Sequence, residues 1–195
     1  MLKSKIDTAA LFAQKKAEVQ STARTLLTLD GRENTYLPVE ELTEELLAIP
    51  EEGALWLDMS LFGSHDQLMT VARSFKLSPA TQNILENKKQ QPRLFRDGNN
   101  RILICRHLQL NESGNAVYNN ICFAASANRL LSVQHGRCDR LKNARTLVTT
   151  LQKPNNTIPQ ALTLIIGKIL DDNCEVINYL EERLQLLAAA YGEQD

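Results

Sequence analysis

Acidic side chains near the C-terminus are the residues of this sequence best suited to chemistry. Asp171, Glu175, Asn178 and Glu182 follow one another at spacings of four, three and four, which places them on one side of a helix. Asp172 lies next to this row. A hydrated Mg²⁺ ion keeps most of its water and needs only one or two carboxylates, so Asp171, Asp172 and Glu175 form a candidate metal site. A solvated helix face predicts the same pattern, and both interpretations stay open.

One long helix must carry these carboxylates. Thr157 is a suitable N-cap, and Pro159 suits the first turn of a helix. No later proline interrupts the chain, and Gly167 is the only glycine before Gly192. We therefore expect residues 159–195 to begin a stalk helix, which is much longer than the average helix of ~11 to 12 residues.

Apolar residues of this helix repeat every seven positions in two series offset by four, the spacing of a coiled-coil seam. The oligomer seam comprises Ile166, Leu170, Asn173, Ile177, Leu180, Leu184, Leu187 and Tyr191. Asn173 is its fully polar member, a residue type that sets register at some cost in stability. A second apolar stripe covers only the first half of the helix, so we expect that half to pack on the domain and the second half to leave it.

The residues before the stalk, 1–158, predict one α/β domain, with residues 1–20 as a leader or short helix. Apolar, β-branched runs closed by turn residues predict strands, and helical periodicity predicts helices. We expect strands at 25–29, 35–38, 54–59, 101–108, 118–125 and 128–133, and helices at 39–47, 64–75, 78–87 and 141–151. Short turns separate the last three strands, which predicts an antiparallel meander.

Composition and motifs exclude several classes of protein. The chain has 22 Lys and Arg against 23 Asp and Glu, and neither sign is concentrated in one long segment. This charge distribution argues against a general nucleic-acid binder. No apolar run reaches the ~18 to 20 residues that cross a bilayer, so the chain as given is expected to be soluble. Neither a phosphate-binding glycine loop nor a nucleophile motif supports an enzyme. The four cysteines form no close pair, which favours a reducing compartment.

Five short segments follow one another in a recognisable order. They are Trp56-Leu57-Asp58-Met59, Phe75-Lys76-Leu77-Ser78-Pro79, Gln90-Gln91-Pro92-Arg93 with the strand 101–108, the strand pair 120–133, and the helix start 169–182. Together they resemble the cytoplasmic domain of CorA-like divalent-cation transporters, including the ZntB-like branch. The first resembles the family's Trp-hydrophobic-Asp/Asn-hydrophobic strand, and the second its Phe-Gly-Ile/Leu-His-Pro helix junction.

The resemblance implies a fold and an assembly. The fold is an α/β/α sandwich with a mixed, largely antiparallel sheet and a long C-terminal stalk helix. The intact transporter would be a pentamer, with this domain on the cytoplasmic side of the inner membrane. The expected partner of this chain is therefore another copy of itself. We expect it to reach the membrane only through a further C-terminal segment, because the family's Gly-Met-Asn signature is absent from these residues.

A regulatory metal is also implied by the resemblance. Many members carry an acidic pair just before their Arg-Pro motif, where it helps to bind a regulatory Mg²⁺ between subunits. The corresponding stretch here, 81–86, has Glu86 as its only acid, and Gln91 replaces the arginine of the motif. Glu86 therefore joins the candidate metal residues, and a weak regulatory Mg²⁺ site is the only cofactor expected.

Two functions from different classes fit these observations. The leading hypothesis is a gating or sensing domain of a CorA-like transporter of Mg²⁺ or another divalent cation. The alternative is a stand-alone interaction protein that associates with itself through the seam and transports nothing. An enzyme acting on a small ligand lacks any catalytic constellation in the sequence.

Overall fold

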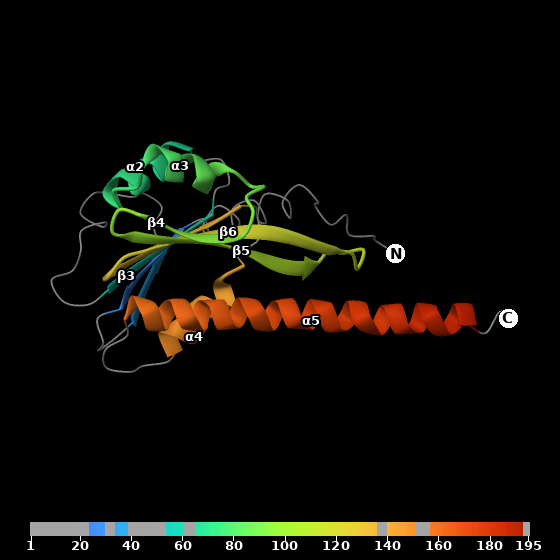
Figure 1. The fold of residues 1–195 in the computed structure, drawn as a ribbon. Helices are drawn as coiled ribbons and strands as arrows, with labels where there is room; N and C mark the ends of the chain where they lie inside the picture. The colour runs from blue at the N-terminus through green and yellow to red at the C-terminus, as the bar shows by residue number, and fades with distance from the viewer. Residues whose placement is uncertain are drawn as a thin grey trace, which may run out of the picture.

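The computed structural model describes residues 24–29, 34–38, 54–60, 65–135, 140–150 and 157–192. Within these ranges, one seven-stranded sheet lies between two helical layers (Figure 1). Helices α2 (His65–Ser74) and α3 (Pro79–Glu86) cover one face of the sheet. Helices α4 (Lys142–Thr150) and α5 (Ile158–Gly192) lie on the other face. The expected α/β/α sandwich with a long C-terminal helix is confirmed.

The sheet is mixed and largely antiparallel, as expected. Its strands in spatial order are β2 (Asn34–Pro38), β1 (Arg24–Leu29), β3 (Ala54–Ser60), β7 (Arg129–Gln134), β6 (Ala116–Ala125), β5 (Asn100–Leu110) and β4 (Arg93–Asp97). Neighbours run antiparallel except β3 and β7, which are parallel with Leu57 beside Leu131. Strands β5, β6 and β7 form the predicted meander, and β5 and β6 continue as a long hairpin past the rest of the sheet (Figure 1).

Side chains of the central strands enter two separate cores, because strand side chains alternate between faces. Leu55 and Leu57 of β3 pack with α2 and α3, whereas Trp56 packs with α4 and α5. In the same way, Cys122 of β6 belongs to the first core and Phe123 to the second. Burial of both faces explains why these strands are apolar at consecutive positions.

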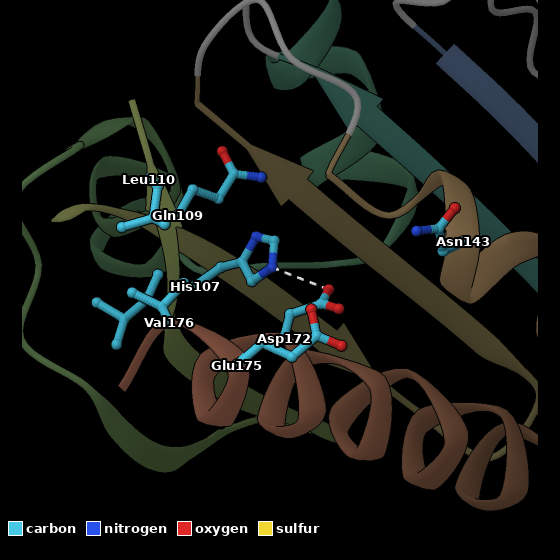
Figure 2. Close-up of a pocket in the computed structure, with 8 residues that line it drawn as sticks. His107, Gln109, Leu110, Asn143, Asp172, Glu175 and Val176 are labelled. Atoms are coloured by element: carbon cyan, nitrogen blue, oxygen red, sulfur yellow. Dashed lines mark hydrogen bonds and ion pairs between the residues drawn. The ribbon is translucent and has the colours of Figure 1, made fainter. Parts of the chain in front are cut away.

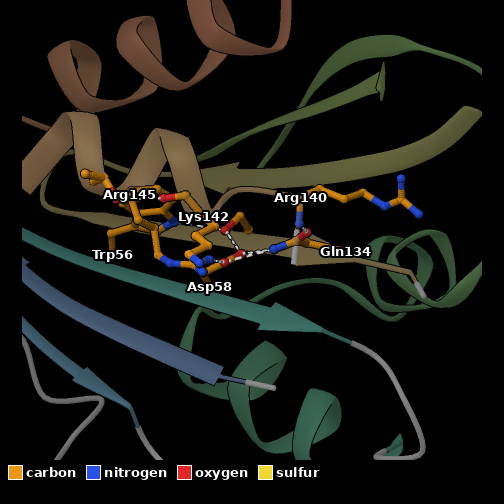
Figure 3. A network of polar contacts seen from close by, with 8 residues as sticks. Trp56, Asp58, Gln134, Arg140, Lys142 and Arg145 are labelled. Carbon is orange, nitrogen blue, oxygen red and sulfur yellow. Dashed lines mark hydrogen bonds and ion pairs between the residues drawn. The ribbon is translucent and has the colours of Figure 1, made fainter. Parts of the chain in front are cut away.

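A buried polar network lies under α4 (Figure 3). Asp58 of β3 is 3% exposed, and its carboxylate accepts hydrogen bonds from Ser132 Oγ at 2.5 Å and from Gln134 Nε2 at 2.9 Å, both on β7. Arg145 of α4, equally buried, donates to the same carboxylate from Nη1. Trp56 Nε1 donates to Ser132 Oγ at 2.9 Å. The network joins two parallel strands and a helix that are far apart in the sequence.

The junction between α2 and α3 contains a left-handed residue. Lys76 has φ of +53°, and its N–H donates to the Arg73 carbonyl at 2.9 Å. The N–H of Leu77 donates to the Ala72 carbonyl at 2.9 Å. These two bonds form a Schellman motif, whose left-handed position is most often glycine. Ser78 follows directly as the N-cap of α3, at the predicted start of that helix.

One strand is not predicted by the sequence pattern. Residues 93–97 form β4 although they are charged and mostly exposed, so no apolar alternation marks them. They become a strand by pairing with β5, where Phe95 lies opposite Ile102 and packs against the α2 and α3 core. The predicted helix at 39–47 and the leader at 1–20 lie outside the described residues.

Removing either half of the buried ion pair should destabilise the domain strongly. Asp58→Ala leaves the Arg145 guanidinium buried without its carboxylate, and Arg145→Ala leaves the carboxylate without its cation. Each change should lower the free energy of unfolding by about 3 to 5 kcal/mol, measured by urea denaturation. Thr146→Ala on the exposed side of α4 is the control, with an expected change within about 0.5 kcal/mol. A loss below about 1 kcal/mol for both buried residues would contradict the role given to the pair.

Candidate functional site

The three carboxylates of α5 in the candidate metal site have different surroundings. Asp171 and Glu175 are exposed, whereas the side chain of Asp172 is 23% exposed. Asp172 Oδ2 lies 3.1 Å from His107 Nε2 on β5 (Figure 2), and Asp172 Oδ1 lies 2.7 Å from Lys168 Nζ, one turn earlier in α5. Asp172 therefore lies next to the acidic row and also belongs to the contact between α5 and the sheet.

His107 is buried between β5 and α5, with an exposed fraction of 3%. Burial lowers the pKa of its imidazole, and this effect outweighs the opposite effect of the Asp172 carboxylate, while the positive charge of Arg140 lowers the pKa further. The ring is therefore neutral near pH 7, with Nε2–H donating to Asp172. Its Nδ1 has no hydrogen-bond partner among the described residues.

A shallow groove of about 420 Å³ opens beside this pair (Figure 2). Its lining includes Gln109, Asn143 and Glu175 together with the His107–Asp172 pair. Carboxylate and amide oxygens are the ligands that a hydrated divalent cation prefers. Among the residues that the structure describes, no three His, Cys, Asp or Glu side chains gather in a way that could hold a metal ion.

The fourth candidate metal residue lies elsewhere. Glu86 is the last residue of α3 and is half-buried in the helical layer on the opposite face of the sheet from α5 (Figure 1). One chain thus carries Asp171, Asp172 and Glu175 on the same part of α5, with Asp172 and Glu175 lining one groove, but does not bring Glu86 to them. A cation shared between Glu86 of one subunit and α5 of another stays a prediction.

Asn173 has a partner within its own chain. Its Oδ1 accepts the N–H of Leu108 at 2.7 Å, and its Nδ2 donates to the carbonyl of Arg106 at 3.0 Å. Strand β4 pairs with β5 only up to Ile104, so among the described strands this part of β5 has a neighbour on one side only. The amide of Asn173 therefore pairs with the edge of β5 as a strand would. In this structure it fixes α5 to the sheet, a different role from setting register in a seam.

The other seam residues are largely uncovered in this chain. Ile166 is half-buried, and the remaining members are exposed, from 38% for Leu180 to 74% for Tyr191. The second apolar stripe behaves as predicted: Ile165, Ile169 and Val176 are buried, the first two in the core with α4. Helix α5 thus packs on the domain with one stripe and leaves an adjacent apolar stripe open.

The tip of the β5–β6 hairpin also contacts α5. The carbonyl of Gly114 accepts a hydrogen bond from Arg183 Nη1 at 3.3 Å. Gly114 has φ of +72°, and a Cβ at this position would lie 3.1 Å from the hydroxyl of Tyr179. A larger residue would therefore be both strained and crowded, and glycine lets the hairpin tip rest against the helix.

Residues 51–194 match the family model described as CorA-like Mg2+ transporter protein, and the chain belongs to that family. No curated protein matches the sequence. Within the described ranges, none of the helices is long and apolar enough to cross a membrane.

Solved structures share the fold at low sequence identity. The soluble domain of CorA from Methanocaldococcus jannaschii aligns with a TM-score of 0.64 and 16% identity over 87% of this chain and 64% of that chain. The full-length CmaX protein aligns with a TM-score of 0.70 and 16% identity, over 89% of this chain and 53% of that chain. The ZntB cytoplasmic domain from Vibrio parahaemolyticus RIMD 2210633 aligns with a TM-score of 0.59 and 16% identity, over 83% of this chain and 63% of that chain. The chain thus spans less than two thirds of each of these proteins.

Two site residues were not singled out by their sequence context, and the contact of a third was not predicted. His107 is an isolated histidine in the sequence. Alternate residues of a strand face the same side, and Leu103 and Cys105 of β5 pack in the core with α5. This alternation indicates that His107 faces α5 as well. Lys168 stands four residues before Asp172, a spacing that indicates a helical ion pair. The pairing of Asn173 with a strand edge has no local signal, because its partners are 65 and 67 residues away.

Loss of the Asn173 amide should loosen α5 from the sheet. Asn173→Ala leaves the Leu108 N–H and the Arg106 carbonyl without these partners, and the free energy of unfolding should fall by about 1 to 2 kcal/mol. Hydrogen exchange of the Leu108 amide should become faster. Asn178→Ala makes the same change at an exposed position of α5 and should be neutral or slightly stabilising. Equal effects of the two changes would contradict the anchoring role.

Stability should fall between pH 7 and pH 5. Burial lowers the pKa of both His107 and His135 below the usual 6.5, and for His135 the nearby Leu85 carbonyl opposes this effect and the Lys88 charge reinforces it. As the pH falls through 6.5, the unfolded chain binds protons that the folded chain does not. Each histidine then lowers the free energy of unfolding by up to about 1.4 kcal/mol per pH unit.

The measurement is urea denaturation of the wild type and of His107→Gln/His135→Gln at intervals from pH 7 to 5. The double variant should show a flatter dependence, because glutamine does not titrate. An unchanged slope would show that other groups carry the pH dependence.

Proposed function

We propose that this chain is the soluble, cytoplasmic-side part of a CorA-like transporter of Mg²⁺ or another divalent cation, and that it senses the cation. Membership of the family and the shared fold support this assignment. The observation that carries the sensing role is the position of Asp172, which lies next to the acidic row and also contacts His107 of the sheet. A charge change on the acidic face therefore reaches the contact between α5 and the sheet directly.

Cation binding would act on the population of assembled states. Asp171 and Glu175 are exposed on α5 and repel the carboxylates of neighbouring copies when no cation is bound. A hydrated Mg²⁺ between copies neutralises this charge, with Glu86 of an adjacent copy as a further candidate ligand. Mg²⁺ then favours the assembled state that binds it more tightly. The shift in population is limited by the difference in Mg²⁺ affinity between the two states.

Lys168 acts as a cation built into this site. Its ammonium forms the 2.7 Å ion pair with Asp172 Oδ1, and hydrogen bonding to Asp172 raises its pKa, with further contributions from Glu175 and Asp171. An arriving Mg²⁺ has to compete with this ammonium. We infer that Lys168 sets the affinity low, so that the site responds to millimolar rather than trace cation.

The uncovered seam supports self-association. Leu184 and Tyr191 are 67% and 74% exposed, and contiguous apolar surface of this kind usually marks an interaction site. A pentamer around the α5 helices is the assembly that we propose for the intact transporter. A stand-alone protein that associates through the same seam is the second candidate, favoured by the same exposed residues, and it would not respond to Mg²⁺.

A Mg²⁺ titration followed by light scattering and thermal melting tests the sensing role. Millimolar Mg²⁺ should raise the average molar mass and the melting temperature of the chain. Lys168→Gln removes the competing ammonium and should shift the midpoint to about threefold lower Mg²⁺. Asp171→Asn/Glu175→Gln should abolish the response. The control Glu181→Gln/Glu182→Gln makes the same charge change further along α5 and should respond like the wild type.

Two outcomes of this titration would count against the proposal. No Mg²⁺ response in the wild type removes the sensing role, and an equal loss in the control variant attributes the response to general helix charge. The seam is tested in parallel: Leu184→Asp should keep the chain monomeric, whereas Leu186→Asp, exposed but off the seam, should not. Association without any Mg²⁺ dependence favours the stand-alone interaction protein.

A further inference from the structure

A second cleft lies at the end of the sheet away from the β5–β6 hairpin tip. Its volume is about 680 Å³, within the range of small-molecule sites. Three segments line it: residues 74–76 at the end of α2, 98–100 in the β4–β5 turn, and 126–129 in the β6–β7 turn. None of these lining residues is acidic, and two of them, Lys76 and Arg129, are cationic.

The guanidinium of Arg129 is held in place at the wall of this cleft. Its Nη1 donates to the carbonyl of Ser74 at 2.9 Å and to the Ser74 hydroxyl at 3.3 Å. The guanidinium also stacks over the ring of Phe75, at 5.5 Å from the centroid. Its Nε is buried and has no hydrogen-bond partner among the described residues. A planar guanidinium held in place in this way is well suited to a phosphate or carboxylate.

Lys76 is an unexpected residue for its backbone position. It occupies the left-handed site of the Schellman motif with φ of +53°, where glycine would avoid the steric cost of a Cβ. The chain instead places an exposed lysine there, in the lining of the same cleft as Arg129. Non-glycine residues held in this conformation are concentrated at functional sites. The unfavourable backbone conformation therefore belongs to a lysine that lines the cleft.

Neutral polar groups complete the lining. Asn99 and Asn128 stand on the two turns, and the side chain of Asn100 is already used, because its Nδ2 donates to the Phe75 carbonyl at 2.9 Å. The neighbouring acid Asp97 is engaged as well, because its Oδ2 accepts the N–H of Ser78 at 2.8 Å. Among the residues that the structure describes, the cleft lining thus presents two cations and the amides of Asn99 and Asn128, and none of these lining residues carries a carboxylate.

We propose that this cleft binds a phosphate-bearing small molecule, with the phosphate held by Lys76 and Arg129. Two positive charges match the double charge of a phosphate, and hydrogen bonds between charged partners are the strong ones. The volume exceeds that of a phosphate group alone, which leaves room for an organic part beside Asn99 and Asn128. This site is independent of the cation site on α5, from which it is separated by the sheet.

The test uses Lys76→Gly, for which stability and binding should change in opposite directions. Calorimetry with inorganic phosphate and with ATP, in metal-free buffer at constant ionic strength, should show saturable binding to the wild type. Glycine fits the left-handed position, so Lys76→Gly should raise the melting temperature by about 2 °C while it weakens the Kd of the anion about tenfold. Lys89→Gln, an exposed lysine outside the cleft, is the charge-matched control and should bind as the wild type.

The two probes distinguish the sources of the phosphate. Equal affinities identify free phosphate as the ligand, and tighter binding of ATP identifies a phosphorylated organic molecule; both support the site. Absence of saturable binding by either probe overturns the proposal. Wild-type affinity in Lys76→Gly also overturns it, and because this variant should be more stable than the wild type, misfolding would not explain a loss of binding.

Discussion

The carboxylate of Asp58 lies inside the domain, where an unpaired charge would cost several kcal/mol, and much of the architecture supplies its partners. Ser132 and Gln134 reach it from β7, which fixes the register of the one parallel strand pair in the described sheet. Arg145 reaches it from α4 and so sets the position of that helix on the sheet. Because α4 shares a core with the first half of α5, the placement of the long helix also depends on this pair.

Polar contacts continue from that core along α5. Asp172 contacts His107, Asn173 pairs with the edge of β5, and further on Arg183 reaches the hairpin tip at Gly114. The first two contacts lie at residues 106–108 of β5, and the third lies at the tip of the β5–β6 hairpin. The hairpin and α5 therefore form one continuous unit that extends from the body of the domain, and the acidic row lies at its centre.

The sequence predicts this structure where local patterns and burial agree. Continuous apolar runs located the central strands, and the absence of proline after Pro159 located α5. Strand β4 escaped prediction because its order comes from pairing with β5 rather than from its own apolar residues. The acids of α5 were visible as a row, but the seam pattern assigned Asn173 to a helix partner, whereas a strand edge 65 residues away takes its amide. Contacts of such sequence separation leave no local pattern.

The attachment of α5 at two levels restricts how it can move. Asn173 and Arg183 are ten residues apart in the helix, a rise of about 15 Å, and both reach the β5–β6 hairpin. Rolling of the helix about its own axis would break both attachments. A movement of the helix and the hairpin together, as one body, keeps both. Displacement of the domain would thus be delivered to the C-terminal end of α5 as a swing rather than a twist, with an amplitude that grows with the length of helix beyond Arg183.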